Sequence, residues 1–144
     1  FEAVGGFDAD LTHAEDQDWL LRAARAGHEI MGINRHLVDY RMSANGLSAD
    51  IGKMYAAWSA LADDCEHHID EAQRAQAEAI YLRYLARRAL RTGGDARLAR
   101  RLAFKGVRQA PAEFLKDVKR GGGTLIGALL SPYVPAALRP KVFA

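Results

Sequence analysis

The spacing of apolar residues beyond position 50 is the feature that most constrains the fold. Apolar side chains recur there in steps of three and four residues, beginning with Ile51, Met54, Tyr55, Trp58, Leu61, Ala62, Cys65 and Ile69. This spacing places them on one face of an α-helix. No heptad repeat persists along the segment, so we predict helices packed antiparallel against one another rather than a coiled coil.

Three more helices are predicted between residues 71 and 120. The first runs from about 71 to 91 and ends at Thr92-Gly93-Gly94, and the second begins after a cap at Asp95. Pro111 suits the first turn of a short third helix. The predicted inward residues of the first helix are Ala77, Ile80, Tyr81, Tyr84 and Leu85, and those of the second are Leu98, Ala99, Leu102, Ala103 and Val107.

The last 24 residues are predicted to form a tail, 121–144, that begins with a flexible joint at Gly121-Gly122-Gly123. An apolar segment, 124–130, follows the joint, and cations lie on both sides of it at Lys116, Lys119, Arg120, Arg139 and Lys141. Such a segment can lie in a membrane interface without crossing it, or it can pack against its own domain. No stretch reaches the roughly 18 consecutive apolar residues that a spanning helix needs.

The net charge of +2 hides an uneven distribution along the chain. Residues 1–72 hold 5 Lys or Arg against 14 Asp or Glu, a balance of −9, whereas residues 73–144 hold 15 against 4, a balance of +11. Either the two halves attract each other or the cationic half faces an anionic surface. Its arginines are expected on outer helix faces without exposed aromatic residues between them, so we do not expect a nucleic-acid partner.

The first 50 residues have a mixed character. The paired glycines in Val4-Gly5-Gly6-Phe7-Asp8 indicate a turn, and Thr12 with Glu15 fits a capping box that begins a helix ended by Gly27. Two short extended segments are predicted after it, at 29–33 and 37–40, followed by a loop.

The densest group of candidate chemical residues is Glu15-Asp16-Gln17-Asp18. A carboxylate in the first turn of a helix lies at the positive end of the helix dipole and stays ionised, so it could accept a proton from an attacking hydroxyl group. Acidic residues in a first turn are also ordinary complements of the dipole. The single cysteine excludes an internal disulfide and a cysteine-built zinc site. The adjacent His67 and His68 point about 100° apart on a helix, so we expect a solvated acidic face there.

The order of these motifs resembles a known family. Val4-Gly5-Gly6-Phe7-Asp8, the run from Glu15 to Arg22, Gly27, and the Tyr40-Arg41 pair together resemble the second half of the catalytic domain in family 2 glycosyltransferases. This large inverting group has the GT-A fold of nucleotide-diphospho-sugar transferases. The resemblance implies a mixed α/β fragment dominated by helix: residues 1–50 as the C-terminal part of the catalytic domain, 51–120 as an antiparallel helical extension, and 121–144 as the tail.

The resemblance also implies an activity, the transfer of a hexose from a nucleotide-sugar donor to a carbohydrate or lipid-linked acceptor in cell-envelope polysaccharide biosynthesis. Asp16 would be the general base that deprotonates the acceptor hydroxyl, and Glu15 would shape the acceptor side. The further substrate-binding residues implied are Gly6, Phe7, Asp8 and Arg41. The enzyme would be cytoplasmic and peripheral at the inner face of the membrane.

The resemblance implies a divalent metal ion, Mg²⁺ or Mn²⁺, bound through an Asp-x-Asp motif that would lie upstream of Phe1. Many family members have a histidine that helps the metal at the position of Ser43, and a serine hydroxyl is a poor substitute for it. Because the chain starts at Phe1 without the nucleotide-binding half, we expect it to be part of a longer protein. Alone, it should be inactive and hold no metal tightly.

A second function remains open, from a different class. About two thirds of the sequence is amphipathic helix, which suits a non-enzymatic α-helical interaction module with a basic side that faces a membrane or a partner. The two hypotheses differ in whether Asp16 is needed for function.

Overall fold

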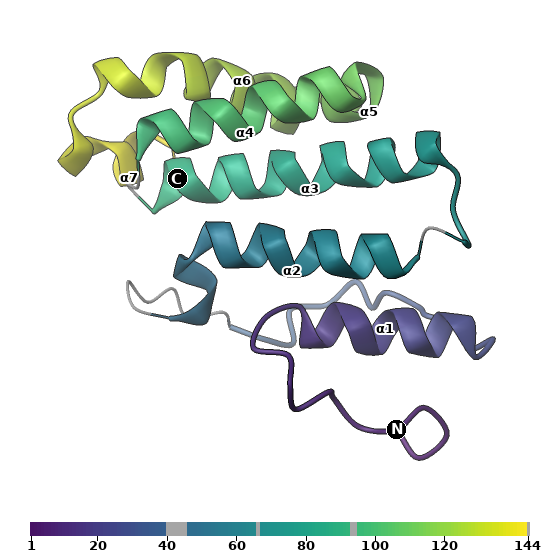
Figure 1. Cartoon of the computed structure of the whole chain (residues 1–144). Helices are drawn as coiled ribbons and strands as arrows, with labels where there is room; N and C mark the ends of the chain where they lie inside the picture. The colour runs from purple at the N-terminus through teal and green to yellow at the C-terminus, as the bar shows by residue number, and fades with distance from the viewer. Residues whose placement is uncertain (40–45, 66, 93–94, 144) are drawn as a thin grey trace. The chain divides into compact units, whose positions relative to one another are not determined.

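The computed structural model describes residues 1–39, 46–65, 67–92 and 95–143, which are mostly helical beyond residue 46 (Figure 1). Two compact units are present, unit 1 (Phe1–Leu61) and unit 2 (Ala62–Ala144). The helices, with three short 3₁₀ turns named η, are α1 (Glu15–Arg25), η1 (Leu47–Ala49), α2 (Ile51–Asp64), α3 (Glu71–Arg91), α4 (Ala96–Gln109), α5 (Pro111–Leu115), α6 (Val118–Leu130), η2 (Ser131–Tyr133), η3 (Ala136–Leu138) and α7 (Arg139–Val142).

The prediction of a mixed α/β fragment was wrong. No residue that the structure describes belongs to a β-strand, and a fragment of a GT-A domain would contain strands. Residues 29–33 and 37–39, which were predicted to be extended, belong to neither a strand nor a helix. A strand forms only where a neighbouring strand completes its hydrogen bonds. The fold therefore gives no support to the glycosyltransferase resemblance.

Helix α1 begins differently from the prediction and ends as predicted. Its N-cap is Ala14 in the left-handed region (φ 62°), without a side-chain cap, and the Thr12 hydroxyl contacts the His13 ring instead of forming a capping box. At the other end Gly27 has φ +82°. The N–H groups of Gly27 and His28 donate to the carbonyls of Ala24 and Ala23, which is the hydrogen-bond pattern of a Schellman motif.

Helix α2 is capped by the carboxylate of Asp50, the residue just before it. The backbone N–H of Lys53 donates to Oδ1 of Asp50 at 3.0 Å. This hydrogen bond, with a smaller contribution from the Lys53 charge, holds the pKa of the Asp50 carboxyl below its usual value. The ionised carboxylate thus stabilises the start of α2.

The core of unit 2 is formed by the pairing of α3 and α4, with α5 and α6 packed across them (Figure 1). Helix α3 begins with a capping box in which Asp70 and Gln73 exchange hydrogen bonds of 2.7 and 3.0 Å. Apolar residues with at most 1% exposure line its inner face: Ala79, Leu82, Leu85, Ala86 and Ala89.

The inner face of α3 differs from the one predicted, whereas that of α4 was predicted correctly. Ile80 and Tyr84 are exposed, so the buried face of α3 is rotated from the predicted one. The buried face is rich in alanine, whose small side chain allows α4 to approach closely. Ala99 and Ala103 of α4 are completely buried.

Three elements of unit 2 meet at Phe114, which is completely buried. A Cβ atom added at Gly106 of α4 would lie 2.7 Å from the Phe114 ring, and one added at Gly121 of α6 would lie 2.3 Å from the Phe114 carbonyl oxygen. The guanidinium of Arg83 donates to that same carbonyl at 2.8 Å, which joins α3 to the end of α5. Glycine at positions 106 and 121 therefore allows α4 and α6 to approach α5 closely.

The three consecutive glycines lie inside α6 rather than in a flexible joint. Asp117 caps the helix by accepting from the N–H of Arg120 at 2.9 Å, and Gly121 and Thr124 face the core. Tertiary packing on Phe114 thus outweighs the low helix propensity of glycine here.

The first prediction concerns Gly121. Gly121→Ala should lower the free energy of unfolding by about 1–3 kcal/mol, because the added methyl group meets a backbone oxygen that cannot move away cheaply. Gly123→Ala is the matched control: nothing lies within 4 Å of its Cβ position, so it should raise stability by about 0.5–1 kcal/mol. Urea denaturation followed by circular dichroism measures both. Equal effects of the two substitutions would contradict the close packing.

The second prediction concerns pH. Because the folded-state pKa of Asp50 is lowered, its stabilisation of α2 is present above the unfolded-state pKa, about 4, and is lost as the pH falls through the folded-state value. An NMR titration of the Asp50 carboxyl measures this directly. Asp50→Asn keeps a side-chain cap but should remove this part of the acid sensitivity. A carboxyl that titrates at the ordinary value would show that the hydrogen bond does not form.

Candidate functional site

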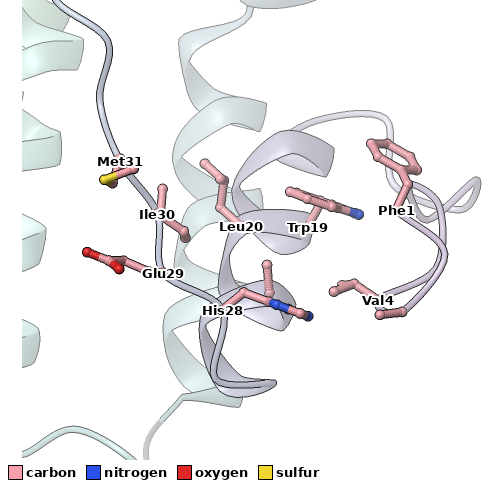
Figure 2. A pocket seen from close by; sticks show the side chains of 10 residues that line it. Phe1, Val4, Trp19, Leu20, His28, Glu29, Ile30 and Met31 are labelled. Atoms are coloured by element: carbon pink, nitrogen blue, oxygen red, sulfur yellow. The ribbon is translucent and has the colours of Figure 1, made fainter.

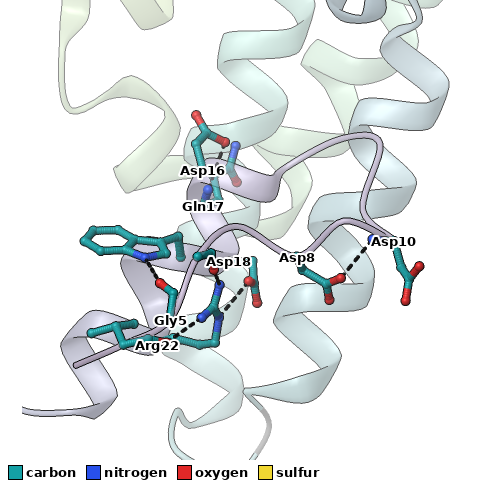
Figure 3. Close-up of polar contacts among 10 residues, drawn as sticks. Gly5, Asp8, Asp10, Asp16, Gln17, Asp18 and Arg22 are labelled. Atoms are coloured by element: carbon teal, nitrogen blue, oxygen red, sulfur yellow. Dashed lines mark hydrogen bonds and ion pairs between the residues drawn. The ribbon is translucent and has the colours of Figure 1, made fainter. Parts of the chain in front are cut away.

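The N-terminal turn of unit 1 is held against α1 mainly by Arg22. Its guanidinium donates to the carbonyl oxygens of Val4 (2.8 Å) and Gly6 (2.7 Å), and its Nε donates to Oδ2 of Asp18 at 2.8 Å (Figure 3). The indole Nε1 of Trp19 donates to the carbonyl of Gly5 at 2.8 Å. The glycine turn and the acidic helix are therefore parts of one hydrogen-bonded structure.

Aromatic side chains reinforce this arrangement. The ring of Phe1 is stacked on Trp19 with centroids 4.9 Å apart, and Phe7 meets Phe1 edge to face at 5.3 Å. Offset stacking and edge-to-face contacts are the favoured geometries for aromatic pairs. Phe7, predicted as a substrate-binding residue, is thus in contact with other aromatic rings.

The predicted catalytic residue, Asp16, is exposed, and Oδ1 accepts a hydrogen bond from the backbone N–H of Gln17 at 2.8 Å. Glu15 is half-buried. Oδ1 of Asp8 accepts from the N–H of Asp10 at 2.9 Å, so both aspartates make local contacts to the backbone. Figure 3 shows Asp16 apart from the contacts of Arg22. A role for Asp16 in proton transfer stays a prediction, and it rested on the family resemblance that the fold contradicts.

Two predicted residues, Arg41 and Ser43, lie outside the described residues. Of the others, the structure brings the Gly6 carbonyl to Arg22, and it does not bring the carboxylates of Asp8 and Asp16 into a shared contact.

Unit 1 contains a pocket of about 380 Å³ beside α1 (Figure 2). It is lined by Phe1, Ala3, Val4, Trp19, Leu20, Ala23, His28, Glu29, Ile30 and Met31. The lining is mostly apolar and includes none of the predicted site residues, so the pocket is not the site that the resemblance implied. In the sequence, the apolar face of α1 at Trp19 and Leu20 indicated one wall of this pocket. The segment after α1, which forms another wall, was predicted to be a strand.

In unit 2, the outer face of α4 carries a group of exposed arginines, called here the α4 arginines: Arg97, Arg100, Arg101 and Arg108. Within the part of the chain that the structure describes, none of these side chains forms an ion pair, whereas Lys105 on the same helix pairs with Glu78 at 2.8 Å. Phe104 lies among them and is half exposed, which corrects the expectation that no exposed aromatic residue accompanies them. Arg88 of α3, also predicted to face outward, is buried.

Helix α6 carries an exposed apolar surface that continues into η2. Four side chains at positions i, i+3, i+4 and i+7 form it, and we call it the α6 stripe: Ile126, Leu129, Leu130 and Tyr133. Tyr133 is 85% exposed. The opposite face of α6 consists of small, buried residues, and Gly127 lies against Leu90 at the end of α3.

The charged residues of the segment that carries the α6 stripe are all of one sign. Residues 118–144 contain no Asp or Glu and four cations, Lys119, Arg120, Arg139 and Lys141. Because η2 packs against α4, the stripe and the α4 arginines belong to one compact unit.

Among the described residues, no helix has the length and apolar character to cross a membrane. The same residues include no group of three or more His, Cys, Asp or Glu side chains that could bind a metal ion. The predicted Mg²⁺ or Mn²⁺ was to be bound upstream of Phe1, so its presence is not tested.

No family model, curated protein or solved structure matches the chain. Together with the all-helical fold, this result removes the support for a family 2 glycosyltransferase, for a nucleotide-sugar donor and for polysaccharide biosynthesis.

The third prediction tests the role of Arg22. Arg22→Ala should destabilise unit 1 by about 1–3 kcal/mol, because two backbone carbonyls and Asp18 lose a charged donor. The loosened turn should also shift the fluorescence of Trp19. Arg97→Ala, which removes an exposed arginine of unit 2, is the control and should leave both unchanged. An Arg22 variant that behaves like this control would show that the turn is held by other contacts.

Proposed function

We propose that the chain is a non-enzymatic helical interaction module that docks on an anionic membrane surface through unit 2. The observation that carries the proposal is the α6 stripe, an exposed apolar surface within a segment that has cations and no carboxylates. Exposed apolar surface of this kind marks a contact with a partner or a membrane. The positive charge around it selects a negatively charged partner.

The apolar contribution comes from the stripe itself. Complete burial of a leucine or isoleucine side chain stabilises by about 1.5–3 kcal/mol. Ile126 and Leu130 are 58% and 53% exposed, so each retains roughly half of this free energy for docking. Because no described helix is long and apolar enough to cross a bilayer, α6 would lie along the interface.

The electrostatic contribution comes from the α4 arginines and from Lys119, whereas Arg120 pairs with Asp117 at 3.3 Å. Each cation near an anionic membrane surface contributes about 1 kcal/mol. Guanidinium groups donate two parallel hydrogen bonds to a phosphate, and the α4 arginines have no described carboxylate that competes for them. The cytoplasmic leaflet holds the anionic lipids of a cell membrane, so we place the module at its inner face.

The fourth prediction is made for the full chain and phospholipid vesicles. The chain should sediment with vesicles that contain phosphatidylglycerol and much less with pure phosphatidylcholine vesicles, and added salt should weaken binding. The pair Ile126→Ser and Leu130→Ser should reduce binding about tenfold or more, because roughly 2 kcal/mol of apolar burial is lost. The pair Leu37→Ser and Val38→Ser, two exposed apolar residues of unit 1, is the matched control.

Replacing the α4 arginines with glutamine should reduce binding and make the remaining binding less sensitive to salt. Circular dichroism confirms that the variants fold. Equal sedimentation of the stripe variant and its control would overturn the proposal. Binding to an oligonucleotide that is stronger than binding to anionic vesicles would assign the basic face to nucleic acid instead.

A further inference from the structure

Three of the α4 arginines lie within about one helical turn, and we call these three the arginine cluster: Arg97, Arg100 and Arg101. Their spacing of three and four residues makes them neighbours on the helix surface, with Cβ atoms about 5–6 Å apart. Arg108 lies two turns further along the helix, and Lys105 is paired with Glu78. The cluster is therefore the densest group of like charges on α4.

The charge of the arginine cluster is not compensated within the described part of unit 2. None of its guanidinium groups forms a hydrogen bond or an ion pair with a described residue, whereas Arg74 and Arg120 each pair with an aspartate. Asp95 is the only acidic residue between positions 79 and 112, and its Oδ1 accepts a hydrogen bond from the backbone N–H of Arg97 at 2.8 Å. Like charges at the spacing of the cluster repel each other. A bound anion removes this repulsion.

The arginine cluster lies at the same end of unit 2 as the α6 stripe (Figure 1). A Cβ atom added at Gly127, in the last turn of α6, would lie 3.0 Å from Leu90 in the last turn of α3. Only residues 92–95 separate α3 from α4, so the first turns of α4, which carry the cluster, are close to this contact. The η2 turn, which ends the stripe, also packs against α4. A membrane in contact with the stripe is therefore within reach of the long arginine side chains.

The oxygen atoms of the anion decide which headgroup suits three neighbouring arginines. A phosphodiester headgroup, as in phosphatidylglycerol, has two unesterified oxygens and a single negative charge. A phosphomonoester has three such oxygens and a charge of about −1.5 to −2 at neutral pH. One guanidinium donates two parallel hydrogen bonds and so occupies both oxygens of a diester, whereas several guanidinium groups can share the three oxygens of a monoester.

We propose that the arginine cluster binds a lipid whose headgroup is a phosphomonoester, the chemistry of phosphatidic acid. This inference rests on the proposed membrane function and deepens it by naming the headgroup that unit 2 prefers. It commits to a lipid rather than to a soluble phosphate ester because the α6 stripe, at the same end of the unit, offers an exposed apolar surface that a bilayer can cover.

Sedimentation of the full chain with three kinds of vesicle tests the preference. Phosphatidylcholine is mixed with phosphatidic acid in one kind and with phosphatidylglycerol in another, in amounts that give both the same surface charge, and the third is pure phosphatidylcholine. Because the surface charge is equal, electrostatic attraction alone gives equal binding to the two anionic vesicles. The chain should bind the vesicles with phosphatidic acid at least about fivefold more tightly, since additional charge-assisted hydrogen bonds form there.

A charge-conserving variant separates hydrogen bonding from charge. Replacing the whole cluster, by Arg97→Lys, Arg100→Lys and Arg101→Lys together, keeps three positive charges but removes the planar guanidinium groups. The affinity for phosphatidic acid relative to phosphatidylglycerol should then fall to a ratio of about one. Arg35→Lys, which changes an exposed arginine of unit 1, is the control and should keep the parent ratio. Circular dichroism confirms that both variants fold.

The outcomes separate this inference from the proposed function. A parent chain that binds both anionic vesicles equally well, or a lysine variant that keeps the parent ratio, would overturn the inference and leave membrane docking intact. A chain that binds neither anionic vesicle would overturn both. Millimolar glycerol 3-phosphate at constant ionic strength should not release the chain from vesicles with phosphatidic acid. Its release would assign the cluster to a soluble phosphate ester and overturn the choice of a lipid.

Discussion

The contact of Phe114 with the backbones of α4 and α6 determines the architecture of unit 2. Gly106 and Gly121 leave no room for a side chain there, so α6 meets the α3–α4 pair through its smallest residues. Its larger apolar residues, which in most amphipathic helices enter the core, are left on the outside. The α6 stripe is thus a consequence of close packing on the opposite face, and the proposed membrane contact depends on that packing.

Unit 1 is organised by different interactions. Hydrogen bonds from Arg22 and Trp19 to backbone carbonyls hold a glycine turn against α1, and the core is small. The segment after α1 keeps exposed apolar residues. Unit 1 therefore depends more on hydrogen bonds to its backbone, whereas unit 2 is built around a core of buried side chains.

The helices between residues 51 and 115 could be predicted, because apolar spacing, Asp95 and Pro111 agree with one another. The lack of strands among the described residues near position 30 could not be predicted, since alternating apolar residues there do not reveal whether a neighbouring strand exists. The role of Gly121 was also ambiguous in the sequence, because a glycine suits either a flexible joint or close helix packing. Only the position of Phe114 decides between the two. The exposure of the α4 arginines was predicted from the sequence. The resemblance around Asp16, in contrast, rested on short motifs that are equally compatible with a turn held by Arg22.

The depth of position 133 in a bilayer tests the central claim most directly. After Tyr133→Cys, an environment-sensitive fluorophore can be attached there while buried Cys65 stays unreacted. With vesicles that contain phosphatidylglycerol, the account predicts a blue-shifted emission that nitroxide groups placed on the acyl chains quench, and little quenching for a label introduced by Gln109→Cys. A label at position 133 that stays in water while the chain is bound to the vesicles would contradict it.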